Sequence, residues 1–251
     1  LEMYIFHSKK KISHNSTGSL RERIAPKMNL FPLARKTREA ALFHCNRHVV
    51  KMALEYCQLL STAKSVADNG GKPLDPAILG VSKTYRPTHV NHPCGVAVRR
   101  SRPAFEFLGR LAIATCERYT EIYGKTHASE GLIRAIVASG LENPTGEPFG
   151  ESTVVGTITD EVGAVVELPL CMPAECVLTD GSGQPDVVAS YRLYYLLEKR
   201  GFAKWPEGCI PDWWIRGLAA KRSFLPTARL YGAQKRVAPT RGRPLAGKLM
   251  G

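Results

Sequence analysis

Two short segments of the chain gather side chains that can move protons or hold anions. The first spans residues 48–55, and the second spans residues 88–93, which read Thr-His-Val-Asn-His-Pro. Each places imidazole groups close to amine, carboxylate or amide groups within otherwise apolar sequence. Burying such groups costs free energy unless they pair with one another or face a cleft. The two segments are therefore the first candidates for an active site.

Helix geometry puts the polar side chains of the first segment on one stripe. Successive residues lie about 100° apart around a helix axis, which places four side chains within an arc of roughly 80°: His48, Lys51, Glu55 and Gln58. Apolar residues cover most of the remaining surface, as in a central helix. We expect the stripe to line an internal cleft, where the ammonium and carboxylate tune each other and the imidazole. The alternative is a buried, structural Lys51–Glu55 pair with His48 bonded to a carbonyl.

The formal net charge of +13 is concentrated at the two ends of the 251-residue chain. Residues 1–38 contain nine Lys and Arg against two Glu, and the residues after Asp212 contain nine Lys and Arg and no acid. Basic ends of this kind most often meet a polyanion, of which nucleic acid is the commonest. We expect residues 232–251, with Arg241 and Arg243, to form an extended arm on phosphates. The alternative is a solvated tail that aids solubility.

Cysteine usage and hydropathy indicate the compartment. No apolar run approaches membrane-spanning length, and the first residues lack the apolar core of a signal peptide. The seven cysteines are an odd number without Cys-x-x-Cys spacing, which favours free thiols in a reducing compartment. We therefore expect a soluble, intracellular protein without a metal site. Zinc ligation by His44, Cys45 and His48 is disfavoured, because adjacent helical residues point in different directions.

Hydrophobic periodicity predicts a mainly α fold: a compact helical domain with a small inserted β-hairpin and basic terminal extensions. Expected helices occupy residues 38–62, 103–123, 129–139 and 186–201, and another opens at Asn91-His92-Pro93. Pro93 suits a first helical turn, Asp186 suits an N-cap and Gly124 suits a helix end. Two β-branched runs, 153–158 and 164–168, predict the hairpin.

Three parts follow from these patterns. Residues 1–27 are a polar, basic leader that we expect to be poorly ordered. Residues 28–214 form the helical catalytic domain, which opens with the short strand-like segment Met28-Asn29-Leu30-Phe31 and contains the hairpin insertion within about 145–185. Residues 215–251 form a basic C-terminal arm.

Several motifs within residues 28–214 together resemble a family of bacteriophage proteins. They are Met28-Asn29-Leu30-Phe31, Cys45-Asn46-Arg47-His48-Val49-Val50-Lys51-Met52, Thr88-His89-Val90-Asn91-His92-Pro93, Glu117-Arg118-Tyr119-Thr120 with Tyr123-Gly124-Lys125-Thr126-His127, and Tyr191-Arg192 with Phe202-Ala203-Lys204-Trp205. The family is assigned to thymidine hypermodification. Its members are amino acid:DNA transferases, also called α-glutamyl/putrescinyl thymine pyrophosphorylases.

The resemblance implies a reaction on DNA in the cytoplasm of a bacterial host. Its substrate is 5-hydroxymethyluracil in double-stranded DNA, already activated as the diphosphate ester. A free amino acid or another amine is the co-substrate, and it displaces pyrophosphate from the exocyclic methylene. The reaction needs a base, cations for the diphosphate, and a nucleobase outside the duplex stack. The resemblance names no resident cofactor and leaves open which amine is used and whether magnesium assists.

The residues and the resemblance together imply roles for individual side chains. His48 or His92 serves as the base, Lys51 helps to neutralise the diphosphate, and Glu55 orients His48 or receives the incoming ammonium. Asn91 suits a pyrimidine edge. Further expected contacts to substrate or DNA are cations (Arg86, Arg99, Lys125, Arg192 and Lys204), stacking tyrosines (Tyr85, Tyr119 and Tyr123), and Gln58, His89 and His127.

Two other readings remain open. The layout is also similar to the pyrimidine-dimer DNA glycosylases, which use a free N-terminal amine as nucleophile. This chain departs from that pattern, because a basic leader precedes Met28. The other reading is a phage DNA-binding protein without catalysis, which would leave a polar stripe on a buried helix without a purpose.

Overall fold

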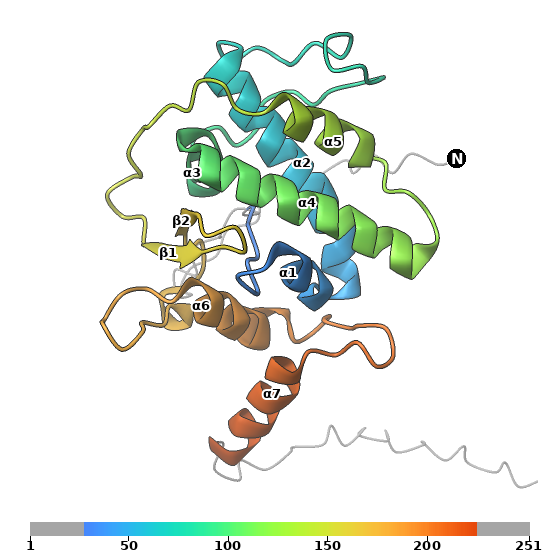
Figure 1. The fold of residues 1–251 in the computed structure, drawn as a ribbon. Helices are drawn as coiled ribbons and strands as arrows, with labels where there is room; N and C mark the ends of the chain where they lie inside the picture. The colour runs from blue at the N-terminus through green and yellow to red at the C-terminus, as the bar shows by residue number, and fades with distance from the viewer. Residues whose placement is uncertain (1–27, 225–251) are drawn as a thin grey trace, which may run out of the picture. The chain divides into compact units, whose positions relative to one another are not determined.

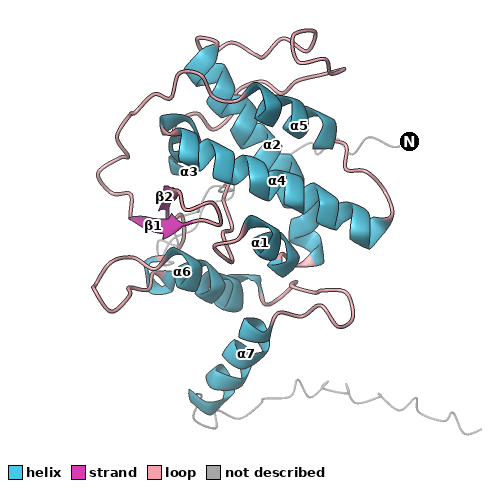
Figure 2. Cartoon of the chain, viewed as in Figure 1, coloured by secondary structure: helices cyan, strands magenta, loops and turns pink. Residues whose placement is uncertain are grey.

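The computed structural model describes residues 28–224, and residues 221–224 only in their backbone. Helices dominate this part of the chain, and its two strands form one hairpin (Figures 1 and 2), which confirms the predicted fold class. The helices are α1 (Thr37–Phe43), α2 (Asn46–Asp68), α3 (Pro93–Arg100), α4 (Arg102–Tyr123), α5 (Glu130–Ser139), α6 (Val187–Tyr194) and α7 (Asp212–Phe224).

The two long helices α2 and α4 pack on each other and form the centre of the domain (Figure 1). Tyr56 and Leu60 of α2 and Phe105, Phe107 and Leu108 of α4 are fully buried there. Helices α1, α3 and α5 pack against this pair. The C-terminal end of α4 is Gly124, in the left-handed conformation (φ 64°) that glycine adopts without strain.

The predicted single helix over residues 38–62 is wrong, because the chain leaves the helical conformation at His44 and Cys45 and forms α1 and α2 instead. The imidazole of His44 donates from Nδ1 to the carbonyl of Ala40 (2.8 Å). In a continuous helix that carbonyl would accept the backbone N–H of residue 44. The side chain therefore competes with the helical ladder and favours the break.

The hairpin pairs β1 (Val155–Thr159) with β2 (Val165–Pro169) in antiparallel register, within two residues of the predicted runs. Asp160 closes its turn by accepting the backbone N–H groups of Val162 (3.0 Å) and Ala164 (2.8 Å). The same carboxylate pairs with Arg110 of α4. The hairpin is therefore fastened to the helical core at its turn.

Helix α6 begins as the sequence predicts, with the carboxylate of Asp186 accepting the N–H of Ala189 (2.9 Å). It continues beyond Tyr194 as a π-helical turn over Tyr195–Lys199. Single π turns within helices are rare and often occur at functional sites. This turn places Tyr195 and Lys199 beside α2, as described below.

The first compact unit of the chain ends at Ile210, and the second starts at Pro211 and contains α7. The predicted leader (residues 1–27) and the predicted arm beyond residue 224 lie outside the described residues. All seven cysteines carry free thiols. Within the described part of the chain, no helix is both long and apolar enough to span a bilayer.

The segment Met28–Leu33 is buried and has no strand partner among the described residues, although the sequence predicts a strand-like conformation. Side chains bind its backbone instead. The N–H of Phe31 donates to the hydroxyl of Tyr56 (3.3 Å), and that hydroxyl lies 2.9 Å from Nε2 of His44. A neutral imidazole that donates from Nδ1 to Ala40 accepts at Nε2 from Tyr56. The segment, α1 and α2 therefore share one hydrogen-bond network.

This network predicts a pH-dependent stability. Burial lowers the pKa of His44 to about 4 from its ordinary 6.5. Below pH 6.5 the unfolded chain binds a proton that the folded chain rejects, so the free energy of unfolding falls as the pH drops toward 4. We expect His44 alone to account for a loss of about 3 kcal/mol over that range. Urea denaturation at a series of pH values measures it.

Two variants separate this effect from general acid sensitivity. His44→Asn keeps a donor near the Ala40 carbonyl but does not titrate, so its stability should fall about 3 kcal/mol less over the same range. His89→Asn removes an exposed imidazole and should retain the wild-type dependence. Equal pH dependence in His44→Asn and the wild type would contradict the neutral, buried His44.

Candidate functional site

His48 lies in the first turn of α2, and its side chain is buried (5% exposed). Its Nδ1 forms a short hydrogen bond with the hydroxyl of Tyr195 from the π turn. Three aromatic rings surround the imidazole, with centroids 4.6 Å (Phe31), 4.9 Å (Tyr195) and 5.5 Å (Phe202) away. The imidazole is thus held at a fixed position by α2, the Met28–Leu33 segment and the end of α6.

The pKa of His48 lies well below its ordinary value. Burial is the largest cause, and the remaining causes are neighbouring groups that are positive when protonated: His44, Lys199, Lys51 and Arg47. Burial also raises the pKa of Tyr195 well above its usual range. At neutral pH the pair is therefore an uncharged imidazole bonded to an uncharged phenol.

Aromatic rings hold two of the cations near this imidazole. The guanidinium of Arg47 lies 5.1 Å from the ring centroid of Phe202. The Nζ of Lys199 lies 4.2 Å from the ring centroid of Tyr194 and donates to its hydroxyl (2.9 Å). Lys51, one turn after His48, carries the third positive charge that lowers the pKa of the imidazole. The site is electropositive around a neutral base.

The predicted internal cleft along α2 is corrected in part. The side chain of Lys51 is 60% exposed, and Val50 and Leu54 on the same side of the helix are exposed as well. This face of α2 is open because α3, α4 and α5 pack on its other sides. Glu55 is 15% exposed and binds Lys51 (2.7 Å), and Gln58 is half-buried. The stripe therefore runs from a buried imidazole to a surface ion pair.

The loop before α3 carries the second predicted segment. His89 has a positive φ (51°), a conformation that few non-glycine residues adopt, and its Nδ1 lies 2.8 Å from the hydroxyl of Thr88. The hydroxyl of Thr62 on α2 binds the backbone N–H (3.0 Å) and the carbonyl (3.2 Å) of Thr88. His92 caps α3, with Nδ1 accepting the N–H of Cys94 (3.2 Å). Asn91 is exposed.

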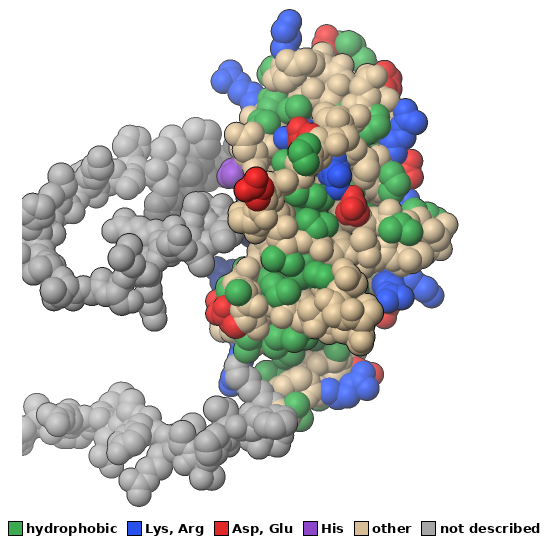
Figure 3. All heavy atoms as spheres, turned by 90° about the vertical axis from the view of Figure 1, so that its left-hand side faces the viewer, with side chains coloured by type: hydrophobic (Ala, Val, Ile, Leu, Met, Phe, Trp, Pro, Cys, Tyr) green, Lys and Arg blue, Asp and Glu red, His purple; other side chains and the backbone are tan. Residues whose placement is uncertain are grey.

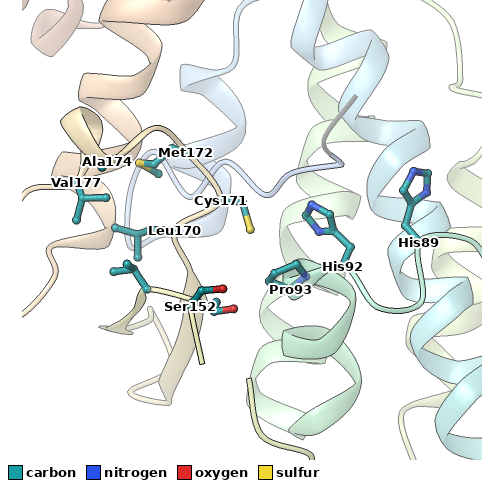
Figure 4. A pocket seen from close by; sticks show the side chains of 11 residues that line it. His89, His92, Pro93, Ser152, Leu170, Cys171, Met172, Ala174 and Val177 are labelled. Carbon is teal, nitrogen blue, oxygen red and sulfur yellow. The ribbon is translucent and has the colours of Figure 1, made fainter. Parts of the chain in front are cut away.

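A cavity of about 770 Å³ lies between this loop and the segment after β2 (Figure 4). His89, His92 and Cys171 form its polar end, and its other walls are mostly apolar, including Leu170 and Met172. Its size and lining are those of a small-molecule site. Apolar side chains gather over the middle of the face of the molecule that Figure 3 shows. Val154 lines the cavity and is also exposed to solvent. The cavity therefore reaches the surface.

The Met28–Leu33 segment joins the cavity to the His48 site. The amide of Asn29 donates to the carbonyl of Cys171 (2.8 Å), and its oxygen lies 3.9 Å from Sγ of Cys94. The Phe31 ring packs on His48, and two residues of extended chain cover about 7 Å. The His48 site and the cavity wall are thus neighbours on one segment.

Other predicted residues gather at the C-terminal end of α4. The ring centroid of Tyr119 lies 4.8 Å from that of Tyr123 and 4.9 Å from that of His127. Tyr123 donates to the carbonyl of Asn46 (3.4 Å), so this aromatic group lies beside the start of α2. Burial lowers the pKa of His127. Lys125 is exposed next to this group.

Two predicted substrate cations make contacts within the protein. Arg99 is almost fully buried, where it pairs with Glu147 and donates to the carbonyl of Val90. Arg192 donates to the carbonyl of Leu33 (2.8 Å). The prediction for Arg99 is therefore corrected, because a buried guanidinium with two of its nitrogens bound to protein acceptors is not available for a diphosphate. Arg192 is half-buried and its bond to Leu33 uses Nε, so its role at the substrate stays a prediction.

Of the remaining predicted residues, Tyr85 and Arg86 lie in the loop before α3, and Lys204 lies next to the start of α2. Tyr85 is half-buried, with its hydroxyl 3.5 Å from that of Ser129, and Arg86 is exposed. The side chain of Lys204 is exposed, while its carbonyl accepts the N–H of Asn46 (2.8 Å) and ties the chain after α6 to the start of α2.

Sequence reasoning did not assign Phe31, Tyr195, Lys199 and Arg47 to the site. Tyr195 and Lys199 lie in the π-helical turn that follows α6, which no residue pattern indicated. One group among the described residues could hold a metal ion, since the ligand atoms of His92, Cys94 and Cys171 all lie within 4.8 Å of one another. Cys94 and Cys171 are 77 residues apart, so their spacing gave no signal.

Comparison with known proteins adds no relative. No protein-family model matches the chain, and no curated protein or solved structure matches it either. The functional assignment therefore depends on the motifs and on the geometry of the site.

Proposed function

We propose that the chain is a DNA-modifying transferase of the phage family that its motifs resemble. It would install an amino acid or another amine on 5-hydroxymethyluracil in double-stranded DNA, with the base already activated as its diphosphate ester. The observation that carries the proposal is the His48 site. There a buried imidazole with a lowered pKa has three lysine and arginine charges around it.

The reaction sets three requirements. The nitrogen of a neutral amine attacks the exocyclic methylene carbon of the activated base. A C–N bond forms, the bond from that carbon to the diphosphate oxygen breaks, and pyrophosphate leaves with the electron pair. The new ammonium centre then gives up a proton. The protein must supply a proton acceptor, cations for the leaving group, and a pocket for the extruded base.

His48 supplies the proton acceptor. In the tautomer that the reaction requires, Nδ1–H donates to the Tyr195 hydroxyl, and the lone pair on Nε2 takes the proton of the amine. The lowered pKa keeps that lone pair free at neutral pH. Tyr195 is then a positioning residue that selects the tautomer, in the way that an acceptor on one ring nitrogen sets the other.

Arg47, Lys51 and Lys199 hold the diphosphate. Their charges act on His48, so an anion bound among them lies next to the base that the reaction needs. Arg47 offers bidentate contacts and the two lysines offer compact charges. The same charges favour the departing pyrophosphate over the bound ester, because negative charge grows on it as the bond breaks.

The cavity beside His92 receives the pyrimidine. Its apolar walls suit the face of a base, and His89 and His92 offer hydrogen-bonding groups at one end. The ion pair of Lys51 and Glu55 is electrostatically linked to both the His48 site and the cavity. The charge of Lys51 lowers the pKa of His48. The pKa of Cys94, behind the cavity, is raised by burial, by the Cys171 thiol and, to a smaller extent, by the charge of Glu55.

We expect His48→Gln to lower kcat by about 10²- to 10⁴-fold with little change in KM, since the variant loses the base and keeps the cations. Lys199→Met should mainly raise KM for the activated DNA, because it removes one positive charge from the diphosphate site. The measurement is pyrophosphate release from DNA carrying the diphosphate ester of 5-hydroxymethyluracil, with an amino-acid mixture as co-substrate.

The matched control is Lys72→Met, which removes one exposed lysine after the far end of α2 and should leave both constants unchanged. Thermal unfolding confirms that each variant is folded. If folded His48→Gln retains wild-type kcat, or if Lys72→Met raises KM as much as Lys199→Met does, the assignment of this site is wrong.

One observation favours the glycosylase as a second candidate. Asn29, the residue after Met28, packs on Cys171 of the cavity wall, where the amine nucleophile of that mechanism would have to act. The two reactions break different bonds. A transferase leaves the glycosidic bond intact, whereas a dimer glycosylase attacks C1′ of the sugar and forms a Schiff base with the protein.

We expect no borohydride-trapped adduct on ultraviolet-irradiated DNA and no strand nicking. We also expect a nucleoside of increased mass from activated DNA only when an amine is present. Mass spectrometry of digested nucleosides and gel analysis of the trapped DNA give the two readouts. A trapped protein–DNA adduct would promote the glycosylase, and DNA binding with neither product would favour a non-catalytic protein.

A further inference from the structure

A cluster of soft ligands lies at the polar end of the cavity. Sγ of Cys94 and Sγ of Cys171 are 3.6 Å apart, and a ring nitrogen of His92 completes a set whose atoms all lie within 4.8 Å of one another. Cys94 is fully buried in the first turn of α3, and Cys171 follows β2. Figure 4 shows Cys171 and His92 on facing walls of the cavity.

The spacing fits a tetrahedral metal ion. With Zn–S bonds of about 2.3 Å, two thiolates of a tetrahedral site lie about 3.8 Å apart. The observed 3.6 Å therefore needs almost no movement. A disulfide needs a separation of about 2.0 Å, so the same pair would have to approach by roughly 1.6 Å. A hydrogen bond from the Cys94 thiol to Sγ of Cys171 spans this distance. When both thiols lose their protons, the two sulfur atoms already have the spacing that a shared cation requires.

Neighbouring groups hold the cluster in place. The carbonyl of Cys171 accepts from Asn29, and the Asn29 oxygen lies beside Sγ of Cys94. The hydroxyl of Tyr191 in turn lies 3.0 Å from that oxygen. Ligand positions fixed by surrounding hydrogen bonds are typical of metal sites. This arrangement also explains why a polar Asn29 is buried at the start of the domain.

We propose that Cys94, Cys171 and His92 bind a divalent metal ion of the zinc class, with its fourth coordination position open to the cavity. Two thiolates and an imidazole select a borderline or soft ion over magnesium or calcium. Three protein ligands with an open position distinguish a site that binds a water or a substrate group from a closed, structural one. His92 and Cys171 line the cavity, so a molecule in it can reach that position.

Metal binding releases protons from the cysteine ligands, and this release balances the charge of the ion. Each cysteine gives up the thiol proton when it ligates, so one divalent ion displaces about two protons and forms a neutral dithiolate centre. Cobalt(II) is the probe, because thiolate ligation gives an ultraviolet charge-transfer band and tetrahedral geometry gives intense visible bands. The full chain is stripped with a chelator, reduced, and titrated with cobalt(II) alone and then with zinc(II).

We expect equimolar cobalt binding with both sets of bands, their loss on adding zinc, and release of about two protons per ion. Cys94→Ser and Cys171→Ser should each lower the charge-transfer absorbance to about half or less of the wild-type value, because each removes one of the two thiolates. They should also weaken zinc binding by more than the roughly 10- to 100-fold that loss of a second-shell partner costs. Cys209→Ser removes an exposed thiol and is the matched control, with binding unchanged.

Three results would overturn the proposal. The first is a cobalt spectrum of the wild type without a thiolate band, a measurement that does not depend on any variant folding. The second is a thiolate band of wild-type intensity in both Cys94→Ser and Cys171→Ser. The third is a Cys94–Cys171 disulfide, detected by peptide mass spectrometry in chain purified under reducing conditions and left unreduced before digestion.

Discussion

The buried segment Met28–Leu33, which has no strand partner among the described residues, organises this domain. Each polar group of such a segment must find a partner in the protein, because none is offered by water or by a sheet. In Met28–Leu33 those partners come from three directions: Tyr56 of α2 binds the N–H of Phe31, Arg192 of α6 binds the carbonyl of Leu33, and Asn29 ties the segment to Cys171. The elements that carry the candidate site are therefore positioned by one structural requirement.

The two buried histidines of this region show how similar burial leads to different roles. His44 has its partners in a backbone carbonyl and a tyrosine, which fix it as part of the framework. His48 also bonds a tyrosine, but its pKa is lowered by two causes. One is burial, and the other is the positive charge of nearby lysine and arginine side chains. Cations gathered around an uncharged base do little for stability. They suit a site where an anion binds and a proton is accepted.

The sequence predicted the mainly helical fold and the hairpin because these depend on local patterns. Asp186 and Gly124 mark helix ends through their own chemistry, and the β-branched runs mark the strands. It failed at the break between α1 and α2, where the bond from His44 to Ala40 depends on burial. It also placed Arg99 at the substrate, because the sequence does not show that Glu147 and the carbonyl of Val90 bind this guanidinium. The π turn and the Cys94–Cys171 pair arise from tertiary packing alone.

The central claim is that the cations around His48 form a diphosphate site next to a neutral base. Histidine ¹⁵N NMR during a titration with inorganic pyrophosphate tests it most directly, with the pKa of His48 measured with and without the anion. The lowered pKa should rise toward its ordinary value on binding, because the anion offsets the positive charges that oppose protonation. By linkage, pyrophosphate should bind more tightly as the pH falls, and Lys199→Met should weaken both effects. An unchanged His48 pKa at saturating pyrophosphate would contradict the account.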